Sequence, residues 1–342
     1  MANLNETDLL ITNMTKFKNL RVVLESSYAF KIQKTHYPNS ISLTSRKAIL
    51  ETDKGRYFLK EKPQYCSDEL LIQKSSLFQD FCSQNTPHVP KIIKTVRGNY
   101  YFEFENRKFF LSEYIDGKPF SGSVNDIESM LDVIKSLNLA GMKFLVNSNL
   151  PKDIIKKFNS YQIATLIPNL IKYVRTEEDK SIFGKIQETL KALTTEYDLI
   201  GNDQYIMAHS DCILFNFIFT KSQTYLIDFD NAKVLPRIHD LAEFFVSATM
   251  LNYLAEITNL KKPVFLTPNK SFKGIVLNYY KNKLKLTKKE VSLFPIVVDI
   301  VWLWTLCLSV LKEDYVLEDL KEVLKKINDK SSRKEIQELL SS

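Results

Sequence analysis

Three oxygen-bearing side chains follow one another closely in the second half of the chain: Asp211, Asn216 and Asp228. Amide and carboxylate oxygens are ligands that Mg²⁺ prefers, together with water and substrate phosphates. A separate carboxylate beside such a site can orient a hydroxyl group and accept its proton. The order of these residues therefore indicates chemistry at a metal-bound phosphate, with Asn216 and Asp228 as metal ligands and Asp211 as the base.

A predicted β-hairpin positions the two metal ligands. Two short runs of aromatic and β-branched residues flank a polar turn, which is a hairpin signal. If the turn is centred on Ser222, Asn216 lies directly opposite Asp228, and opposed residues have Cβ atoms roughly 4.5 to 5.5 Å apart. Asp211 then lies on the loop that leads into the hairpin. The predicted strands cover 216–219 and 225–227.

The residues around this hairpin resemble those of the aminoglycoside phosphotransferase and choline kinase superfamily, which includes spore-coat-associated kinase-like and homoserine-kinase-like proteins. That superfamily usually has His-Gly-Asp-x-x-x-x-Asn, then Ile-Asp-Phe-Asp-x-Ala, then Asp-Leu-Ala. The matching segments here are His209-Ser-Asp211, Asn216, Ile227-Asp-Phe-Asp-Asn-Ala232 and Asp240-Leu-Ala242. Two departures occur: Ser210 replaces the usual Gly, and Cys212-Ile-Leu-Phe replaces a common His-Pro-Gly-type turn.

The resemblance implies a role for each of the three central residues. Asn216 and Asp228 would hold Mg²⁺ against the nucleotide, which neutralises phosphate charge. Asp211 would orient the acceptor hydroxyl and take its proton late in the transfer.

Three other polar residues of the same segment would support these groups. His209 would pack against the hairpin end and hold backbone by a hydrogen bond, rather than act as an acid or base. Asp230 is a candidate for a second metal contact, although an Asx turn is the simpler interpretation. Asp240 stands at the start of a predicted helix, where a cap is the direct explanation, and the resemblance adds that it packs behind the metal loop.

The sequence predicts an α+β protein with the bilobal, protein-kinase-like fold that the resemblance implies. A small antiparallel-sheet N-lobe with one helix would cover residues 1–114. A larger, mostly helical C-lobe, 115–342, would carry the catalytic loop and metal-binding hairpin, 207–242. In the N-lobe we expect strands over 29–34, 46–52, 56–60, 99–105 and 108–114, and a helix over 67–81. In the C-lobe we expect helices over 124–145, 152–174, 180–199, 239–254, 270–280, 288–311 and 313–340.

The resemblance also implies nucleotide-binding residues in the N-lobe. Lys60 matches the strand lysine that contacts the α and β phosphates. Glu69 is the candidate for an ion pair with Lys60, although an acid near a helix start has a simpler electrostatic explanation. Ser42 lies in the loop that would cover the phosphates, which contains no glycine. Backbone groups of Glu113 and Ile115 would bind the adenine.

Composition excludes several other classes of protein. The chain has 342 residues with 44% hydrophobic and 25% charged residues, which is typical of a globular protein. Its net charge of +7 is not gathered with aromatic residues into a strip, so we expect no nucleic-acid partner. The four cysteines are scattered, which indicates neither a zinc knuckle nor a disulfide framework. Free thiols suit a reducing cytoplasm.

No membrane partner is expected either. The N-terminus lacks the basic and apolar regions of a signal peptide. The most apolar segment, 291–311, contains Pro295 and Asp299. Placing an Asp in the centre of a bilayer costs about 2.5 to 3.5 kcal/mol on insertion scales, so we expect a buried helix there.

The implied function is transfer of the γ-phosphate of ATP, with GTP as an open alternative, to a hydroxyl of a small molecule. The acceptor would be an aminoglycoside-, choline- or homoserine-like alcohol, and the oligomeric state is left open. The net basic charge weighs against a polycationic antibiotic, unless Asp126, Glu128 or Glu243 makes the acceptor pocket acidic. Two other classes stay open. A kinase-fold binding or coat protein with little activity is suggested by the irregular loop, and a protein kinase is disfavoured by the missing Gly-rich loop and Asp-Phe-Gly.

Overall fold

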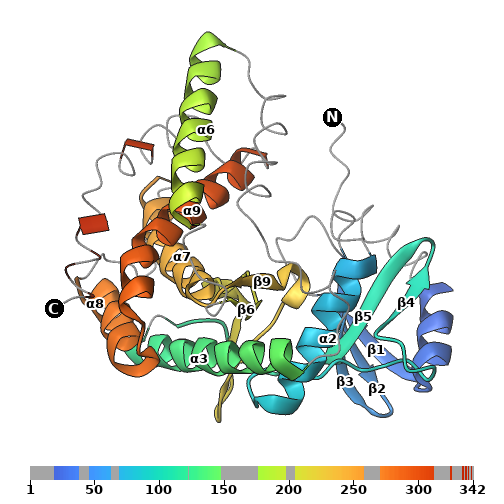
Figure 1. Ribbon diagram of the computed structural model, residues 1–342. Coiled ribbons are helices and arrows are strands. Elements are labelled where there is room, and N and C mark those ends of the chain that lie inside the picture. Colours follow the sequence, from blue (N-terminus) through green and yellow to red (C-terminus); the bar gives the residue numbers. More distant parts are fainter. Residues whose placement is uncertain are drawn as a thin grey trace. The chain divides into compact units, whose positions relative to one another are not determined.

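The computed structural model describes residues 19–37, 46–62, 69–121, 123–147, 176–197, 205–257 and 270–311, and seven positions nearer the end: 324, 325, 333, 334, 336, 338 and 340. The chain divides into two compact units, Met1–Asp116 and Gly117–Ser342 (Figure 1). The predicted helix 152–174, most of the predicted helix 313–340, and Ser42 lie outside the described residues.

A five-stranded antiparallel sheet forms the N-terminal unit, in the order β1-β2-β3-β5-β4 (Figure 1). Its strands are β1 (Ile32–His36), β2 (Lys47–Thr52), β3 (Gly55–Glu61), β4 (Tyr101–Phe104) and β5 (Arg107–Glu113). The β4–β5 turn has positive φ at Glu105 and Asn106, 51° and 58°, which is the two-residue hairpin turn whose twist matches its strands. The predicted strands are found here within a few residues, except the first.

The first strand begins at Ile32, whereas the alternation of residue types predicted Ala29. The reason is a helix over 19–28 that precedes it. Ala29 follows the last helical residue with a φ of 54°, the left-handed conformation that commonly ends a helix. The alternating residues after Tyr28 therefore first close the helix and only then enter the sheet.

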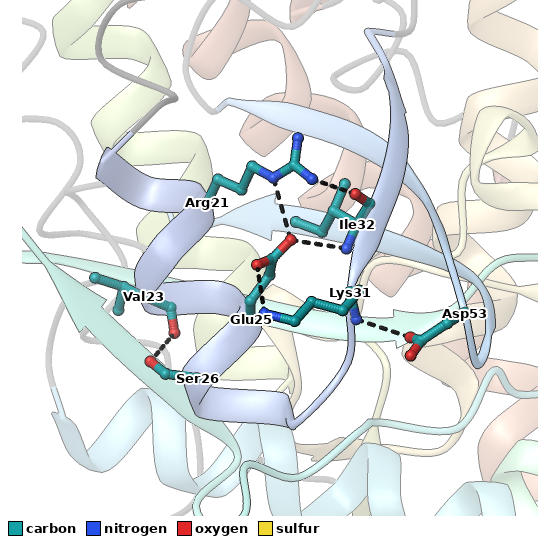
Figure 2. Close-up of polar contacts among 7 residues, drawn as sticks. All are labelled: Arg21, Val23, Glu25, Ser26, Lys31, Ile32 and Asp53. Atoms are coloured by element: carbon teal, nitrogen blue, oxygen red, sulfur yellow. Dashed lines mark hydrogen bonds and ion pairs between the residues drawn. The ribbon is translucent and has the colours of Figure 1, made fainter.

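Glu25 joins this helix to the sheet (Figure 2). Its carboxylate accepts hydrogen bonds from the Ile32 N–H at 2.9 Å and from the Arg21 guanidinium at 3.1 Å, and the Lys31 ammonium lies 3.3 Å away. The bond to the Ile32 N–H outweighs partial burial and holds the pKa of Glu25 below its usual value. The preceding residue is held as well, because the Lys31 N–H donates to the Asp53 carboxylate at 2.7 Å.

The helix 19–28 and one face of the sheet enclose the core of the N-terminal unit. Its members are buried aliphatic and aromatic side chains: Leu20, Leu24, Tyr28, Phe30, Ile32, Ala48, Leu50, Leu59, Phe102, Phe109 and Leu111. Helix α2 (Glu69–Asn85) is tied to the sheet by polar contacts. The Lys62 ammonium donates to the Ser75 hydroxyl at 3.2 Å, and the Tyr101 hydroxyl donates to Glu69 at 3.0 Å.

The C-terminal unit is mostly helical and contains two small antiparallel ribbons (Figure 1). Its longer α-helices among the described residues are α3 (Val124–Asn147), α6 (Glu177–Tyr197), α7 (Ile238–Ile257), α8 (Lys270–Tyr279) and α9 (Lys288–Leu311). One ribbon pairs β6 (Tyr205–Ala208) with β9 (Lys233–Pro236), and the other pairs β7 (Phe217–Phe219) with β8 (Thr224–Leu226). Helix α9 packs against α6 and α7, and α3 packs against β6.

Helix α9 covers the most apolar segment of the sequence and is buried in the C-terminal unit. Val297, Ile300 and Leu303 are at most 1% exposed. Asp299 is also buried and forms an ion pair with Arg333. Burial nevertheless raises the pKa of Asp299 to about 6. Among the described residues, no helix combines the length and the apolar character that crossing a bilayer requires.

Gly141 sets the distance between α3 and β6, the strand that leads into the predicted catalytic loop. A Cβ atom on Gly141 would clash with the carbonyl oxygen of Met207 on β6. On helix α6, a Cβ atom on the exposed Gly184 would meet nothing within 4 Å. The two glycines therefore make a matched pair.

We predict that Gly141→Ala lowers the free energy of unfolding by about 1 to 3 kcal/mol, because the added methyl group forces the helix from the strand. Gly184→Ala should leave it unchanged or raise it by up to about 1 kcal/mol, because Ala favours a helix interior. Urea denaturation of both variants tests this. Equal effects of the two substitutions would contradict the close approach.

Candidate active site

The hairpin forms, but its predicted register is wrong by one residue on the second strand. Phe217 pairs with Leu226 and Phe219 with Thr224. The Thr220 side chain explains the shift, because its hydroxyl oxygen accepts hydrogen bonds from the N–H groups of the turn and closes a two-residue loop. The sequence had indicated a longer turn centred on Ser222. Asn216 consequently lies beside Ile227 instead of opposite Asp228.

Two hydrogen bonds fix the backbone that enters Asp228. The Ile227 N–H donates to the carbonyl oxygen of Asn216 at 2.9 Å. The Ile227 carbonyl lies 3.1 Å from Nε2 of His209. Asp228 itself is left-handed, with φ 72° and ψ 62°. Such a conformation is uncommon for a residue other than glycine, and it is concentrated at functional sites.

Asn216 contacts Asp211 through its side-chain nitrogen. Nδ2 donates to the backbone carbonyl of Asp211 at 2.9 Å and to its carboxylate Oδ2 at 3.0 Å. Because both amide hydrogens are on Nδ2, the opposite end of the side chain presents the Oδ1 acceptor. Asn216 is thus able to orient the Asp211 carboxylate and to offer an oxygen to a cation at the same time.

The side chains at the end of the hairpin fit a hard cation. Asn216 and Asp228 supply oxygen donors, the type that Mg²⁺ and Ca²⁺ take in place of the nitrogen and sulfur typical of zinc. Within the described residues, no group of three or more His, Cys, Asp or Glu side chains is arranged to hold a metal. A cation at Asn216 and Asp228 would complete its shell with water or phosphate oxygens, as Mg²⁺ commonly does.

His209 is buried and serves as a hydrogen-bond donor. Its side chain packs edge-on against Phe229, with ring centroids 4.5 Å apart. Burial lowers the pKa of His209 to about 4, which outweighs the opposing effect of the Asp228 charge. A neutral imidazole that donates from Nε2 to the Ile227 carbonyl has no proton on Nδ1. His209 thus holds the hairpin, the kind of contact that the sequence indicated for it.

The carboxylate of Asp240 holds the start of the loop. It accepts the N–H of His209 at 3.0 Å and the N–H of Ser210 at 2.8 Å. The expectation that Asp240 caps a helix is wrong, because α7 already begins at Ile238. Ser210 has a φ of 58°, which explains why glycine is common at this position. Burial and the nearby Glu243 charge raise the pKa of Asp240 to about 6.

The remaining site residue of this segment, Asp230, lies within the 3₁₀ turn Phe229–Asn231. The hydrogen bonds described above bring Asp211, Asn216, Asp228 and His209 together around the hairpin end. Their chemical roles, and a second metal contact by Asp230, stay predictions.

Residues expected to bind the nucleotide lie in the N-terminal unit. Lys60 is half-buried on the central strand β3. Its side chain points to the face of the sheet opposite the one that carries the core residue Leu59. The contact that the structure shows for Glu69 is with Tyr101, so an ion pair with Lys60 stays a prediction. The Glu113 N–H donates to the Lys91 carbonyl at 2.9 Å, which leaves only the Glu113 carbonyl for adenine. The roles of Lys60, Glu113 and Ile115 also stay predictions.

The sequence did not reveal two residues of α7 that contact the loop. Glu243 accepts the N–H of Cys212, and Ser247 accepts the N–H of Leu214, both at 3.1 Å. Glu243, a candidate for an acidic acceptor pocket, has a side chain that is 13% exposed and lies 3.3 Å from His239. Their signal in the sequence is the spacing of Asp240, Glu243 and Ser247, with only apolar residues between them, which places all three on one face of the helix.

The architecture is that of the kinase-like fold. An amicoumacin kinase solved with AMP-PNP, Ca²⁺ and Ami superposes with a TM-score of 0.70 at 14% identity, over 94% of this chain and 96% of its own. A choline kinase of Cryptosporidium parvum gives 0.63 at 13% identity, over 95% and 98%. A microcompartment-associated aminopropanol kinase gives 0.63 at 13%, over 91% and 94%. The predicted α+β fold is confirmed.

A sequence model described as the phosphotransferase enzyme family matches residues 38–256. The chain belongs to this family, and the resemblance to the aminoglycoside phosphotransferase and choline kinase superfamily is confirmed. No curated protein sequence matches the chain.

Burial of His209 makes the protein sensitive to acid. The pKa of His209 is about 4 in the folded protein, and its ordinary value is 6.5. Between pH 6.5 and pH 4 this histidine is therefore mostly protonated in the unfolded chain and mostly neutral in the folded protein. We predict that the free energy of unfolding falls by about 2 kcal/mol more in wild type than in His209→Gln between pH 7 and pH 5. Urea titrations at both pH values measure this.

The comparison has an internal control. The raised pKa of Asp240 acts in the opposite direction, because the folded protein then binds the proton more readily. Asp240 is present in both proteins, so its contribution largely cancels. If wild type and His209→Gln lose the same stability between pH 7 and pH 5, His209 is not buried in its neutral form.

Proposed function

We propose that the protein transfers the γ-phosphate of ATP to a hydroxyl group of a small molecule, with Mg²⁺ as cofactor. The observation that carries the proposal is the double contact of Asn216 Nδ2 with the backbone and the carboxylate of Asp211. It ties a candidate base to a candidate metal ligand at the end of one hairpin. The match to the phosphotransferase enzyme family supports the reaction class.

The residues of the loop divide the work of phosphoryl transfer. Asp211, held at Oδ2 by Asn216, would accept a hydrogen bond from the acceptor hydroxyl and point its oxygen at the phosphate. The hydroxyl proton would pass to Asp211 as the new oxygen–phosphorus bond forms and the bond from the γ-phosphorus to the β–γ bridging oxygen breaks, with ADP as the leaving group. His209 would take no part in this step, since its Nε2 is engaged with the Ile227 carbonyl and its Nδ1 is buried. A bound Mg²⁺ would neutralise phosphate charge at Asn216 and Asp228.

The nucleotide and the acceptor class rest on the relatives. The amicoumacin kinase was solved with AMP-PNP, and a spectinomycin phosphotransferase with ADP and spectinomycin. Other relatives are named for choline and aminopropanol, which are small amino alcohols. We propose the same acceptor class here, a small alcohol that carries an amine. ATP, Mg²⁺ and Lys60 as a phosphate-binding residue belong to the same proposal.

The first test is phosphate transfer from ATP to a panel of amino alcohols, choline and aminoglycosides. We predict that Asp211→Ala keeps nucleotide binding but lowers kcat by about 10²-fold or more, the scale of a positioned base. Glu188→Gln, an exposed acid on α6, is the control and should match wild type. Equal turnover by wild type and Asp211→Ala would refute the role of Asp211.

The second test concerns the cation and separates an enzyme from an inactive binding protein. We predict that ATP raises the melting temperature of the wild type more with Mg²⁺ than with EDTA, because a ligand that binds only the folded state stabilises it. Asp228→Asn should lose this magnesium-dependent increment. A wild type that shows no increment would contradict the metal site and favour the inactive alternative.

A further inference from the structure

Helix α7 carries three polar side chains within the segment 240–247, whose other residues are apolar. Asp240, Glu243 and Ser247 are separated by three and four positions, so they lie on one face of the helix. The residues between them are buried hydrophobic side chains: Leu241, Ala242, Phe244, Phe245 and Val246. A helix interior of this kind tolerates polar groups only where they are hydrogen-bonded.

Each of these three side chains accepts backbone N–H groups from the loop 209–214. The four hydrogen bonds join His209 N to Asp240 Oδ2 at 3.0 Å, Ser210 N to Asp240 Oδ1 at 2.8 Å, Cys212 N to Glu243 Oε2 at 3.1 Å, and Leu214 N to Ser247 Oγ at 3.1 Å. The loop thus lies along the helix and is held by side chains at successive positions.

The loop needs these acceptors because the residues that donate to them are buried and form no ladder with a strand. Cys212 is fully buried and Leu214 is 1% exposed. A buried N–H group without a partner costs free energy comparable to a lost hydrogen bond. Without Glu243 and Ser247 the segment would have to move toward water to satisfy its amides.

The bond to Glu243 acts directly on Asp211. The N–H of Cys212 and the carbonyl of Asp211 belong to the same peptide group. Glu243 holds its nitrogen end at 3.1 Å, and Asn216 Nδ2 holds its oxygen end at 2.9 Å. With both ends held, the backbone rotation that aims the Asp211 side chain is fixed.

Glu243 is suited to this task because it is a charged acceptor. Burial alone would raise its pKa, but the adjacent His239 and Lys233 hold the pKa of Glu243 below its ordinary value. Its second oxygen lies 3.3 Å from His239 Nε2. Hydrogen bonds to an ionised carboxylate are about twice as strong as those between neutral groups.

We propose that Glu243 and Ser247 are positioning residues for phosphoryl transfer: they hold the stretch between Asp211 and Asn216 by its backbone and thereby aim both side chains. The inference rests on the proposed function and adds to it two residues that touch neither nucleotide nor acceptor.

The test combines kinetics with hydrogen exchange. Ser247→Ala removes the Leu214 acceptor, and Ser247→Thr keeps a hydroxyl. Glu243→Leu removes the Cys212 acceptor, and Glu243→Gln keeps an oxygen. Ser292→Ala is the matched control, because the exposed Ser292 hydroxyl donates only within its own helix, to the Lys289 carbonyl at 2.8 Å. For each variant we would measure kcat, the KM for MgATP, and amide exchange of Cys212 and Leu214 by NMR.

We expect Ser247→Ala and Glu243→Leu to lower kcat by about tenfold or more while KM for MgATP changes less than about twofold. The Leu214 and Cys212 amides, respectively, should exchange about tenfold faster. Ser247→Thr and Glu243→Gln should restore most of the kcat, and Ser292→Ala should match wild type. If the two residues had only a structural role, the variants would lose stability. They would not show a fall in kcat at nearly constant KM, or a recovery of kcat in the conservative variants.

Any of three results would overturn the inference. The first is an unchanged kcat in Ser247→Ala, and the second is unchanged exchange of the Cys212 and Leu214 amides. The third is that kcat falls as much in Ser247→Thr as in Ser247→Ala, and as much in Glu243→Gln as in Glu243→Leu. If Glu243→Leu does not fold, the Ser247 pair and Glu243→Gln decide. A wild type that transfers no phosphate to any acceptor would instead overturn the proposed function, and the exchange of Cys212 and Leu214 would still report separately whether α7 holds the loop.

Discussion

The need to satisfy buried backbone amides governs the candidate site. Four of the six residues in the loop 209–214 are buried and the loop forms no strand, so the N–H groups of those residues require side-chain partners. Asp240 supplies two of these bonds with a single carboxylate, at 2.8 and 3.0 Å. Burial raises the pKa of that carboxyl group to about 6, so its desolvation opposes the hydrogen bonds that it forms.

Two short stretches of backbone connect these hydrogen bonds to the candidate catalytic residues. The peptide after Asp211 is held through Asn216 and Glu243, and the backbone before Asp228 is held through Asn216 and His209. Asn216 takes part in both, once through its side chain and once through its carbonyl. The residue proposed as a metal ligand is therefore also the link between the base and the second ligand. The left-handed Asp228 and Ser210 mark the two places where the backbone turns sharply to permit this.

Much of this was accessible from the sequence, because residue types at short range decide it. The hairpin, the β4–β5 turn and the order of sheet and helices follow from local patterns. The register of β7 and β8 did not, since alternation cannot tell a two-residue turn from a three-residue one, and the Thr220 hydroxyl decides between them. The partners of Asp240 and Glu243 were hidden for another reason: their contacts span some thirty positions, and only the packed fold brings these segments together.

The central claim is that the hairpin end binds the cation of a metal–nucleotide complex beside Asp211. The most direct measurement is a crystal structure with AMP-PNP and Mn²⁺ in place of Mg²⁺, in which anomalous scattering locates the cation. We predict a Mn²⁺ ion bound by Asn216 Oδ1 and the Asp228 carboxylate, with the γ-phosphate facing Asp211. A cation bound elsewhere, with Asn216 and Asp228 both free of metal and phosphate, would contradict it.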